Sequence, residues 1–563
     1  MPEKILLMKP PTNFIPISWG YVIATLDQAG IPYDFWDTNR PTNPHEYYLE
    51  RVHQGEYLAA ATGGFVYSTN WFVDATQRLK SLAPQMPVVL GGNITRDVRI
   101  ELMFQHIQID FAVIGEAETS FPQLLQALAA GSSFELVPGL AFRRNDGSVA
   151  RNAPVRFDLT EQFWMPSYKR IDLQNYLNGY LHHIVPGLGR LLPVMTGRGC
   201  KGGCSFCSPT IGHFMPRPVE HILRELEIYE HLYDFESIAF ATEIFFNKPE
   251  DIEQFCREYM KLRKRRPWVC SFRMDQPPEL LLLMKEAGCA MVNIGLESAS
   301  QSILGRLKKG CTIDGFKRAY DAAIRAGLMV DAPFMMTNED ETAADIKQTF
   351  DFVIENRIDG GFGLVGTYPG TAIYHRAVKK GLITDEWEYI TKTLREVAWA
   401  SPSIMDIPYL NISAMKHEEL FRTVFSQVRR YYSFLYHEFK ANNMALTISH
   451  SSTMPVPELQ GECLRCGEQT RLALSRGAAV QVIEYKFVCL QCHQKNFMHF
   501  VDIAQARTYY EELGQSLRQA GKLLLVGTGK NTQDFLLYDI FGISFDQIVG
   551  VLHWPGEPGH KHF

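Results

Sequence analysis

Three cysteines on one glycine-rich stretch constrain this chain more than any other feature. Cys200, Cys204 and Cys207 have C-x3-C-x2-C spacing within residues 197–207 and follow the apolar residues 191–195. Thiolate is the preferred ligand of iron–sulfur clusters, and glycine lets the backbone wrap closely around such a group. Because three ligands leave one iron of a four-iron cluster open, the sequence predicts a [4Fe-4S] cluster. Structural or zinc-bound cysteines are the alternative.

This spacing resembles the radical S-adenosylmethionine (SAM) superfamily. In that family the open iron chelates the amino and carboxyl groups of SAM, and an electron from the cluster splits the sulfonium to give a 5'-deoxyadenosyl radical. Residues 190–400 also show the alternation of strands and helices expected of the family's partial TIM barrel. The resemblance implies that Glu243, Arg273 and Glu297, which follow three predicted strands, act at the site. Glu243 would bind the amino group of SAM, and Ser298 would lie near its ribose and carboxylate.

Two later turns can also be compared with motifs of the radical SAM superfamily. Residues 337–342, Thr-Asn-Glu-Asp-Glu-Thr, differ from the Gly-x-Pro-Gly-Glu-Thr that often follows the corresponding strand in relatives, so no SAM contact is assigned to them. Residues 368–371 match the Tyr-Pro-Gly-Thr turn of many relatives.

The first 150 residues form a second pattern of predicted strands, each followed by polar or glycine-rich turns. The strands are a segment ending at Asp37 and residues 4–8, 57–62, 87–90 and 111–114. Doubly wound sheets bind ligands at the carboxyl ends of their strands, where glycines admit close approach. The pattern therefore predicts a doubly wound α/β domain that binds a nucleotide or another cofactor, without saying which.

This region resembles the cobalamin-binding domain that precedes the barrel in one large class of radical SAM enzymes. The shared features are Pro-Pro near the start, Gly-Gly after the fourth strand and Gly-Glu-x-Glu after the fifth. The resemblance implies cobalamin contacts from Gly63, Gly64, Tyr67, Ser68, Thr69, Asn70, Gly91, Gly92, Asn93, Gly115, Glu116 and Glu118.

The histidine that ligates cobalt in many cobalamin proteins has no counterpart here. The motif Asp-x-His-x-x-Gly is absent, because Asp37 is followed by Thr-Asn-Arg. We therefore expect cobalamin without a histidine ligand, with residues 67–71 beneath the corrin. A cap of the following helix by Ser68 or Thr69 is the alternative role of that segment, and both roles are compatible.

A second group of cysteines lies near the C-terminus. Cys463 and Cys466 form one C-x2-C knuckle, and Cys489 and Cys492 form another, with a β-rich stretch between them. Four thiolates with this spacing are typical of a zinc ribbon, whose closed tetrahedral site has a structural role. We expect zinc in a ribbon over residues 456–500; a rubredoxin-like iron or an auxiliary cluster is the alternative.

The remaining segments complete the expected domain organisation. Residues 151–189 form a linker, residues 401–455 a helical closure of the barrel, and residues 501–563 a small α/β tail with a docking role. The apolar positions of the helical segment are Leu420, Val424, Phe425, Val428, Tyr431 and Tyr432. Their near-helical spacing favours packing over a substrate-binding stripe.

Composition excludes several other classes of protein. The net charge of −6 implies no broad basic field for nucleic acid, and no apolar run approaches the ~18 residues of a membrane span. The first residues lack the features of a signal peptide, so a cytoplasmic location is expected. The four scattered cysteines are expected to be buried small hydrophobes. They are Cys256, Cys270, Cys289 and Cys311.

Together these patterns predict a cobalamin-dependent radical SAM methyltransferase. It would move a methyl group from SAM via methylcobalamin to an unactivated carbon of a small-molecule or natural-product substrate. An electron donor such as flavodoxin or ferredoxin would supply the reducing electron. The alternatives are a non-methylating reaction such as cyclisation or ring contraction, a scaffold without catalysis, and a polar methyl transfer in which Glu243 ligates the fourth iron.

Overall fold

The computed structural model describes most of the chain up to residue 438 and shorter stretches beyond it. The described residues are 4–12, 15–38, 45–155, 157–179, 188–208, 213–358, 360–394, 409–438, 442–451, 454–464, 466–473, 482–488, 495–501, 523–526 and 548–552.

The N-terminal domain contains a seven-stranded sheet in the order β2-β1-β3-β4-β5-β6-β7, in which the first five strands are parallel and the last two antiparallel. This confirms the predicted doubly wound pattern, because the chain proceeds in opposite directions from β1. The strands are β1 (Lys4–Lys9), β2 (Tyr33–Asp37), β3 (Tyr57–Gly63), β4 (Val88–Gly91), β5 (Phe111–Val113), β6 (Leu140–Arg143) and β7 (Val149–Arg151).

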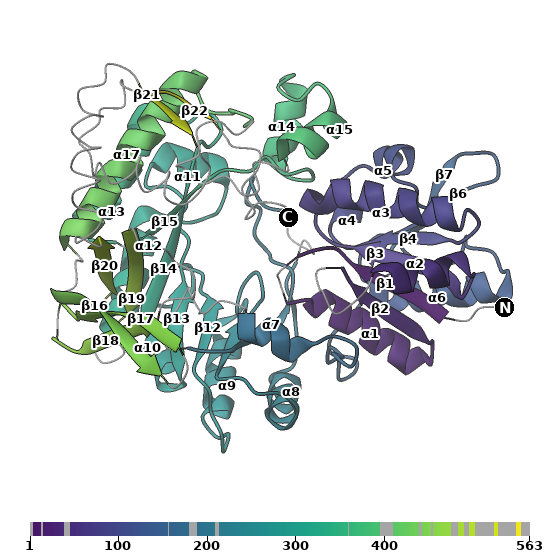
Figure 1. Cartoon of the computed structure of the whole chain (residues 1–563), viewed down its shortest axis with the longest axis horizontal. Coiled ribbons are helices and arrows are strands. Elements are labelled where there is room, and N and C mark those ends of the chain that lie inside the picture. Colours follow the sequence, from purple (N-terminus) through teal and green to yellow (C-terminus); the bar gives the residue numbers. More distant parts are fainter. Residues whose placement is uncertain are drawn as a thin grey trace.

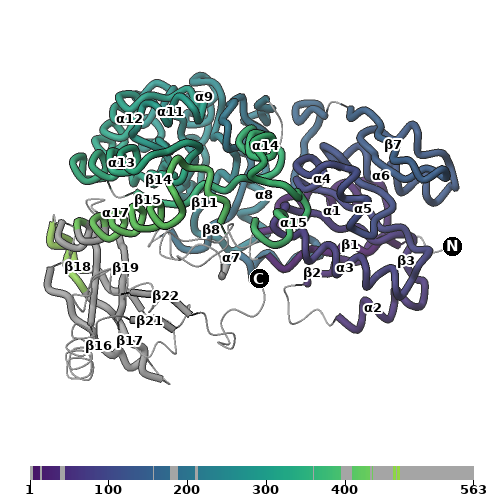
Figure 2. Tube along the Cα trace, turned by 90° about the horizontal axis from the view of Figure 1, so that it is seen from above, coloured from purple at the N-terminus to yellow at the C-terminus, as the bar shows by residue number. Residues whose placement is uncertain are grey.

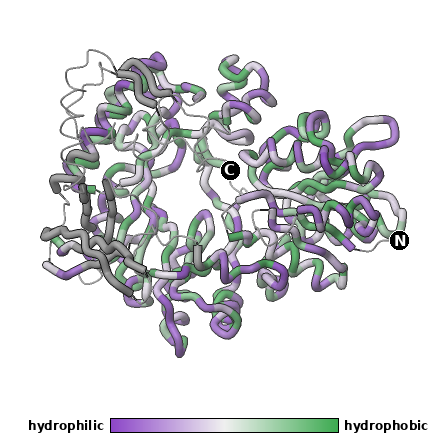
Figure 3. Tube along the Cα trace, in the orientation of Figure 1, coloured by the Kyte–Doolittle hydropathy of each residue, from purple (hydrophilic) through white to green (hydrophobic). Residues whose placement is uncertain are grey.

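Helices cover both faces of this sheet (Figure 1). Alternate residues of β1 belong to the cores on opposite faces of the sheet. Ile5 and Leu7 pack with α1 and α6, whereas Leu6 and Met8 pack with the helices of the other face. Burial on both faces is typical of a parallel sheet, and Figure 3 shows its strands as mostly hydrophobic. The helices are α1 (Ile17–Ala29), α2 (His45–His53), η1 (Val66–Ser68), α3 (Thr69–Leu82), α4 (Ile94–Asp97), α5 (Ile100–His106) and α6 (Ala117–Ala130).

The second sheet has six strands that follow one another in chain order, and all are parallel. An ordered parallel sheet with helices on its outer side is a partial barrel, as predicted. The strands are β8 (Leu191–Val194), β11 (Ser237–Phe240), β12 (Trp268–Ser271), β13 (Cys289–Asn293), β14 (Met329–Met336) and β15 (Gly360–Leu364). In Figures 1 and 2 the N-terminal domain lies beside this barrel.

Three helices of the barrel region begin at a threonine that caps them. Thr312, Thr342 and Thr371 each accept a hydrogen bond from a backbone amide of the helix that follows, as N-cap residues do. The helices of this region are α7 (Leu173–Gly179), α8 (Val219–Leu232), α9 (Pro249–Tyr259), α10 (Leu280–Glu286), α11 (Gln301–Leu307), α12 (Ile313–Arg325), α13 (Ala343–Glu355), α14 (Ala372–Lys379), α15 (Glu386–Glu388) and η2 (Tyr389–Leu394). The short strands β9 (Gly197–Arg198) and β10 (Met215–Pro216), which lie before and after the cysteines in the chain, pair antiparallel.

Helix α17 (His417–Glu438) covers the edge of the barrel sheet. The Tyr431 hydroxyl donates to the carbonyl oxygen of Gly360 at 3.0 Å and accepts from its amide at 2.8 Å, so it pairs the free edge of β15. The apolar residues that the sequence assigned to packing are buried, which confirms that prediction except for Tyr432, whose side chain lies outside the described part. The buried residues are Leu420, Val424, Phe425, Val428 and Tyr431.

Beyond α17 the described residues are strands, so the helical segment ends before the predicted boundary at 455. The strands are β16 (Asn442–Ser451), β17 (Met454–Glu462), β18 (Gln469–Ala473), β19 (Val482–Val488), β20 (Lys495–Val501), β21 (Leu523–Val526) and β22 (Ile548–Leu552). Cys463 is buried and Cys466 exposed in the turn between β17 and β18. Cys489 and Cys492 lie outside the described residues, so the zinc ribbon stays a prediction.

Two smaller expectations can be compared with the fold. Cys256, Cys270 and Cys289 are buried, as expected, whereas Cys311 is only half-buried. No helix in the described part of the chain is long and apolar enough to cross a membrane.

Candidate active site

A cavity of about 600 Å³ opens at the carboxyl ends of the N-terminal strands and reaches the barrel. On the barrel side Pro193, Ala239 and Ala241 line it, near the ends of β8 and β11. Seven residues that the sequence assigned to cobalamin also line it: Gly63, Gly64, Tyr67, Ser68, Gly91, Gly92 and Asn93. The cavity therefore lies where a doubly wound sheet binds ligands.

Glycines allow the two loops at the rim of this cavity to touch. A Cβ on Gly63 would lie 2.6 Å from the carbonyl oxygen of Gly91, and a Cβ on Gly92 would lie 2.6 Å from the amide nitrogen of Gly64. Gly92 also has a left-handed φ of 82°, which side chains rarely adopt. No larger residue fits at either position without moving backbone.

The cavity also has an apolar branch between the sheet and two helices. Trp19 and Val22 of α1, Phe121 of α6, and Val89 and Val113 of the sheet line this part. Such a wall suits an uncharged ring system.

The segment predicted to lie beneath the corrin is only partly in the cavity wall. The ring of Tyr67 stacks on Phe65 at 5.3 Å, and burial raises the pKa of its phenol, which stays protonated. Thr69 instead donates to the carbonyl oxygen of Val66, and Asn70 donates to that of Thr391 at 2.9 Å. The alternative helix cap is absent, because Ser68 makes no side-chain capping bond to α3.

Asp37, where the missing histidine motif would begin, belongs to a buried group of polar side chains. Lys9, at the end of β1, donates to Asp37 at 3.3 Å and to the carbonyl oxygen of Thr12 at 2.7 Å, and Tyr176 of α7 donates to Asp37. No histidine occurs among the described residues that line the cavity.

Two of the three cysteines of the loop lie against Gly202. A Cβ there would lie 3.3 Å from the sulfur of Cys200 and 3.6 Å from that of Cys204. Burial and the neighbouring thiols raise the pKa of Cys207 to about 11, so a metal must displace protons to bind. The described residues contain no group of three His, Cys, Asp or Glu side chains that could hold a single metal ion. A cluster does not need one, because each thiolate binds a different iron.

Charged side chains at barrel strand ends surround this loop. Glu243, after β11, accepts from the amide of Gly199 at 3.2 Å. Arg273 follows β12, and its guanidinium lies close to Gly202, 3.5 Å from where a Cβ on that glycine would be. The guanidinium also pairs with the carboxylate of Asp275 at 2.9 Å. One negative and one positive group therefore lie beside the cysteine loop, and the roles assigned to them stay predictions.

Glu297 is held in a strained position. It has a left-handed φ of 74° and is 8% exposed, and Lys309 donates to its carboxylate. Strained backbone of this kind concentrates at functional sites. Ser298, by contrast, is fully buried, and its hydroxyl lies 3.2 Å from that of Thr349, so its side chain stabilises the turn. Lys309 belongs to none of the motifs recognised in the sequence.

Glu116 and Glu118 do not line the cavity as the sequence implied. Both carboxylates accept hydrogen bonds from Arg198, two residues before the first cysteine. Burial raises the pKa of Glu116, although Arg198 opposes this shift. Gly115, with a φ of 93°, also lies outside the cavity lining. The physical reason is charge: a buried guanidinium between two domains attracts the acidic turn more strongly than an apolar cavity does.

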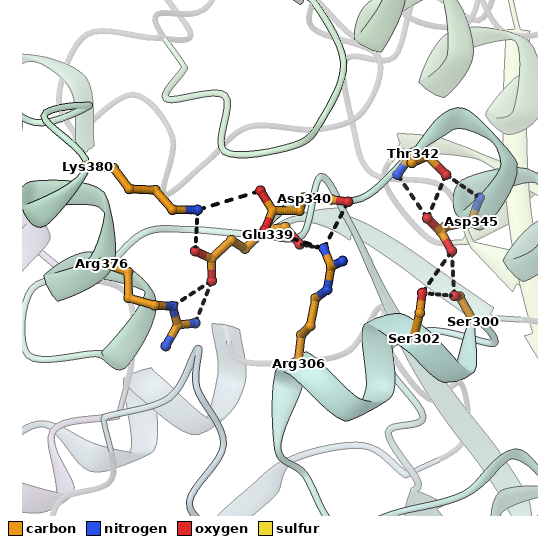
Figure 4. Close-up of polar contacts among 9 residues, drawn as sticks. All are labelled: Ser300, Ser302, Arg306, Glu339, Asp340, Thr342, Asp345, Arg376 and Lys380. Atoms are coloured by element: carbon orange, nitrogen blue, oxygen red, sulfur yellow. Dashed lines mark hydrogen bonds and ion pairs between the residues drawn. The ribbon is translucent and has the colours of Figure 1, made fainter.

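The loop after β14 is fixed by a polar network (Figure 4). Glu339 pairs with Arg376 of α14 and with Lys380, which directly follows this helix. Arg306 donates to the carbonyl oxygens of Glu339 and Asp340 at 3.1 and 3.0 Å. These contacts attach residues 337–342 to α11 and α14, although their sequence differs from that of relatives.

Comparison with known proteins agrees with this geometry. A family model described as the radical SAM superfamily matches residues 194–353. An uncharacterised methyltransferase of Pyrococcus horikoshii is 30% identical over 326 residues, which cover 55% of this chain and 68% of that protein. The chain belongs to a methyltransferase-like family of the radical SAM superfamily.

Two further relatives align over shorter shares of their length. The bacteriochlorophyllide d C-12(1)-methyltransferase of Chlorobaculum tepidum is 26% identical over 209 residues, covering 35% of this chain and 45% of that enzyme. The anaerobic magnesium-protoporphyrin IX monomethyl ester cyclase of Rubrivivax gelatinosus is 24% identical over 367 residues, covering 63% and 62%.

Two solved radical SAM structures share the fold. The methyltransferase TsrM from Kitasatospora setae, with tryptophan and a SAM analogue bound, superposes with a TM-score of 0.57 at 16% identity, covering 67% of this chain and 76% of TsrM. The enzyme OxsB with aqua-cobalamin bound gives 0.53 at 17% identity, covering 62% and 52%.

Proposed function

We propose that this radical SAM enzyme moves a methyl group from SAM, through cobalamin, to a carbon of a small-molecule substrate. One observation carries the proposal: the cavity at the strand ends of the N-terminal domain continues to Pro193, Ala239 and Ala241 of the barrel. When bound, the cluster supplies an electron and cobalamin carries the methyl group, which is chemistry that side chains cannot perform.

The cavity fits cobalamin in shape and chemistry. Its glycine rim, where Gly63 and Gly92 have no room for a side chain, admits a flat macrocycle close to the backbone. The apolar branch beside Trp19 and Phe121 suits the benzimidazole end of the cofactor's tail. No histidine lies on the described wall of the cavity, so cobalt would find no imidazole ligand there. Tyr67 and Ser68 would lie against that face of the corrin instead.

The cysteine loop fits a four-iron cluster with SAM on its open iron. Cys200, Cys204 and Cys207 would hold the cluster, and the nearby Arg273 guanidinium offsets its negative charge. Glu243 would bind the SAM ammonium group. Glu297, oriented by Lys309, would accept hydrogen bonds from the ribose hydroxyls.

Anaerobic turnover tests this function directly. Reconstituted enzyme is incubated with SAM, hydroxocobalamin, reductant and candidate substrates, and the products are weighed by mass spectrometry. We expect a product heavier by one methyl group in place of hydrogen, and none with Cys204→Ala. A substrate converted without any gain of methyl would contradict the methyltransferase assignment.

A cyclisation without methyl transfer is the second candidate. The alignment with an anaerobic cyclase over 63% of this chain favours it. The same assay distinguishes the two reactions, because cyclisation changes the mass only by loss of hydrogen or by addition of oxygen.

Two further assignments rest on sequence alone. Cys463, Cys466, Cys489 and Cys492 would bind a structural zinc, which elemental analysis of the purified chain tests. An electron donor such as flavodoxin or ferredoxin would reduce the cluster, which replacing the chemical reductant in the turnover assay tests.

A further inference from the structure

Both ends of the cysteine loop are attached to the N-terminal domain. Arg198 stands two residues before Cys200, and Ser208 directly follows Cys207. Each of these flanking residues makes polar contacts with a turn of the N-terminal domain that lies 80 or more residues earlier in the chain. The loop is therefore held by two domains, although all its cysteines belong to the barrel.

The first attachment is a buried ion-pair group. The Arg198 side chain is 8% exposed and pairs with Glu116 and Glu118, and its guanidinium lies 4.5 Å from the ring centre of Tyr21 and 5.3 Å from that of Phe157. Removing one partner of a buried pair leaves an uncompensated charge, so this contact resists separation.

The second attachment is at the other end of the loop. The Ser208 hydroxyl donates to Asp97 at 2.8 Å, and Arg96 donates to the carbonyl oxygen of Ser208 at 3.1 Å. Gly370 completes the contact, because a Cβ there would lie 3.2 Å from both Asp97 and the hydroxyl oxygen of Ser208.

The same two turns border the cofactor cavity. Asp97 ends α4, which directly follows the cavity residues Gly91, Gly92 and Asn93, while Glu116 and Glu118 follow β5. Thr95 of α4 donates to the carbonyl oxygen of Val113 at 2.7 Å and joins the two turns. A ligand that orders these turns also orders the supports of the cysteine loop.

We propose that Arg198, Glu118, Asp97 and Ser208 are positioning residues that couple the cofactor cavity to the cysteine loop. Binding of cobalamin in the cavity stabilises the cluster, and a loaded cluster strengthens cobalamin binding by the same factor, since coupling between two sites is reciprocal. This inference rests on the proposed function, which supplies both groups.

Iron loss to a chelator measures the coupling without turnover. The full reconstituted chain is treated anaerobically with a chelator, with and without hydroxocobalamin, and the cluster absorbance is followed. For the wild type we expect loss to slow by about five-fold or more, at the lower end of coupling between sites. The electron paramagnetic resonance spectrum of the reduced cluster is expected to change when cobalamin binds.

Variants of the attachment separate positioning from folding. Glu118→Gln combined with Ser208→Ala is expected to abolish both the protection and the spectral change while cobalamin still binds. Glu135→Gln is the matched control, because it breaks an exposed pair with Arg144 inside the same domain. Circular dichroism checks that each chain is folded, and Ser208→Ala alone serves if the double variant is not.

Each outcome decides the inference. Wild-type chain that binds both groups but shows no effect of cobalamin on iron loss overturns the coupling and leaves the proposed function intact. Wild-type chain that binds no cobalamin overturns the proposed function. In that case the positioning role still predicts that the variant Glu118→Gln with Ser208→Ala loses iron faster than Glu135→Gln does. Equal rates of iron loss in the two variants would overturn the positioning role too.

Discussion

Lys309 donates a hydrogen bond to the carboxylate of Glu297, and the same ammonium group reaches the carbonyl oxygen of Gly295. Gly295 leaves room for this contact, because a Cβ there would lie 2.5 Å from the Glu297 carboxylate. The buried carboxylate is thereby neutralised and oriented at the end of β13. The lysine is thus as much a part of the candidate SAM site as the glutamate that the sequence identified.

Lys309→Met is expected to weaken SAM binding and to lower the free energy of unfolding by about 3 kcal/mol, since it leaves a buried carboxylate without its partner. Urea unfolding and SAM titration measure the two effects. Lys347→Met is the control, because Lys347 pairs with Asp351 at the surface, where such pairs contribute about 1 kcal/mol or less. Equal losses in the two variants would contradict a special role for Lys309.

Gly92→Ala is expected to abolish cobalamin binding, because its Cβ would collide with the amide of Gly64 at the cavity rim. Gly131→Ala is a matched control in the same domain. Gly131 also has a left-handed φ, of 62°, but a Cβ there meets nothing within 4 Å. Both variants carry a backbone cost of about 1 to 2 kcal/mol, so cobalamin absorbance in the purified proteins distinguishes collision from strain. Retention of cobalamin by Gly92→Ala would refute the glycine rim.

The sequence was informative wherever a local pattern determines structure. Alternating strands and helices predicted two parallel sheets, and glycines after β3 and β4 predicted the cavity rim that Gly63 and Gly92 form. The C-x3-C-x2-C spacing placed three thiols on one loop for the same reason. Each of these features depends on residues close together in the chain.

Contacts between distant segments could not be predicted in this way. Glu116 and Glu118 matched a local motif, but their partner Arg198 is about 80 residues away in another domain. The pairing of Lys9 and Asp37 with Tyr176 is equally non-local. A local motif fixes a turn, whereas the charge that a neighbouring domain presents to it decides what the turn binds.

Buried Glu341 is expected to make stability depend on pH. Burial raises its pKa to about 7. Between the ordinary glutamate pKa and pH 7 the folded chain keeps a proton that the unfolded chain has lost, so stability falls as pH rises through this window, by about 3 kcal/mol in total. Glu341→Gln should therefore be more stable than wild type at pH 8 and similar at pH 5, as measured by urea unfolding. An equal difference at both pH values would contradict this account.

Glu243 decides between radical and polar methyl transfer. Its carboxylate contacts the amide of Gly199, one residue before the first cysteine, so it lies close enough to the loop for either role. If it binds the SAM ammonium group, Glu243→Gln should weaken SAM binding by about 1 to 3 kcal/mol, the loss expected for a hydrogen bond to a charged group. The wild type should then release 5'-deoxyadenosine during turnover.

If Glu243 instead ligates the fourth iron, the wild type should form methylated product and S-adenosylhomocysteine without 5'-deoxyadenosine, and Glu243→Gln should gain reductive cleavage of SAM. We expect the first outcome, because Arg273 and Glu297 flank the same loop as further candidate groups for binding SAM. Chromatography of one anaerobic reaction resolves both nucleosides, and methyl transfer without 5'-deoxyadenosine would assign Glu243 to the cluster.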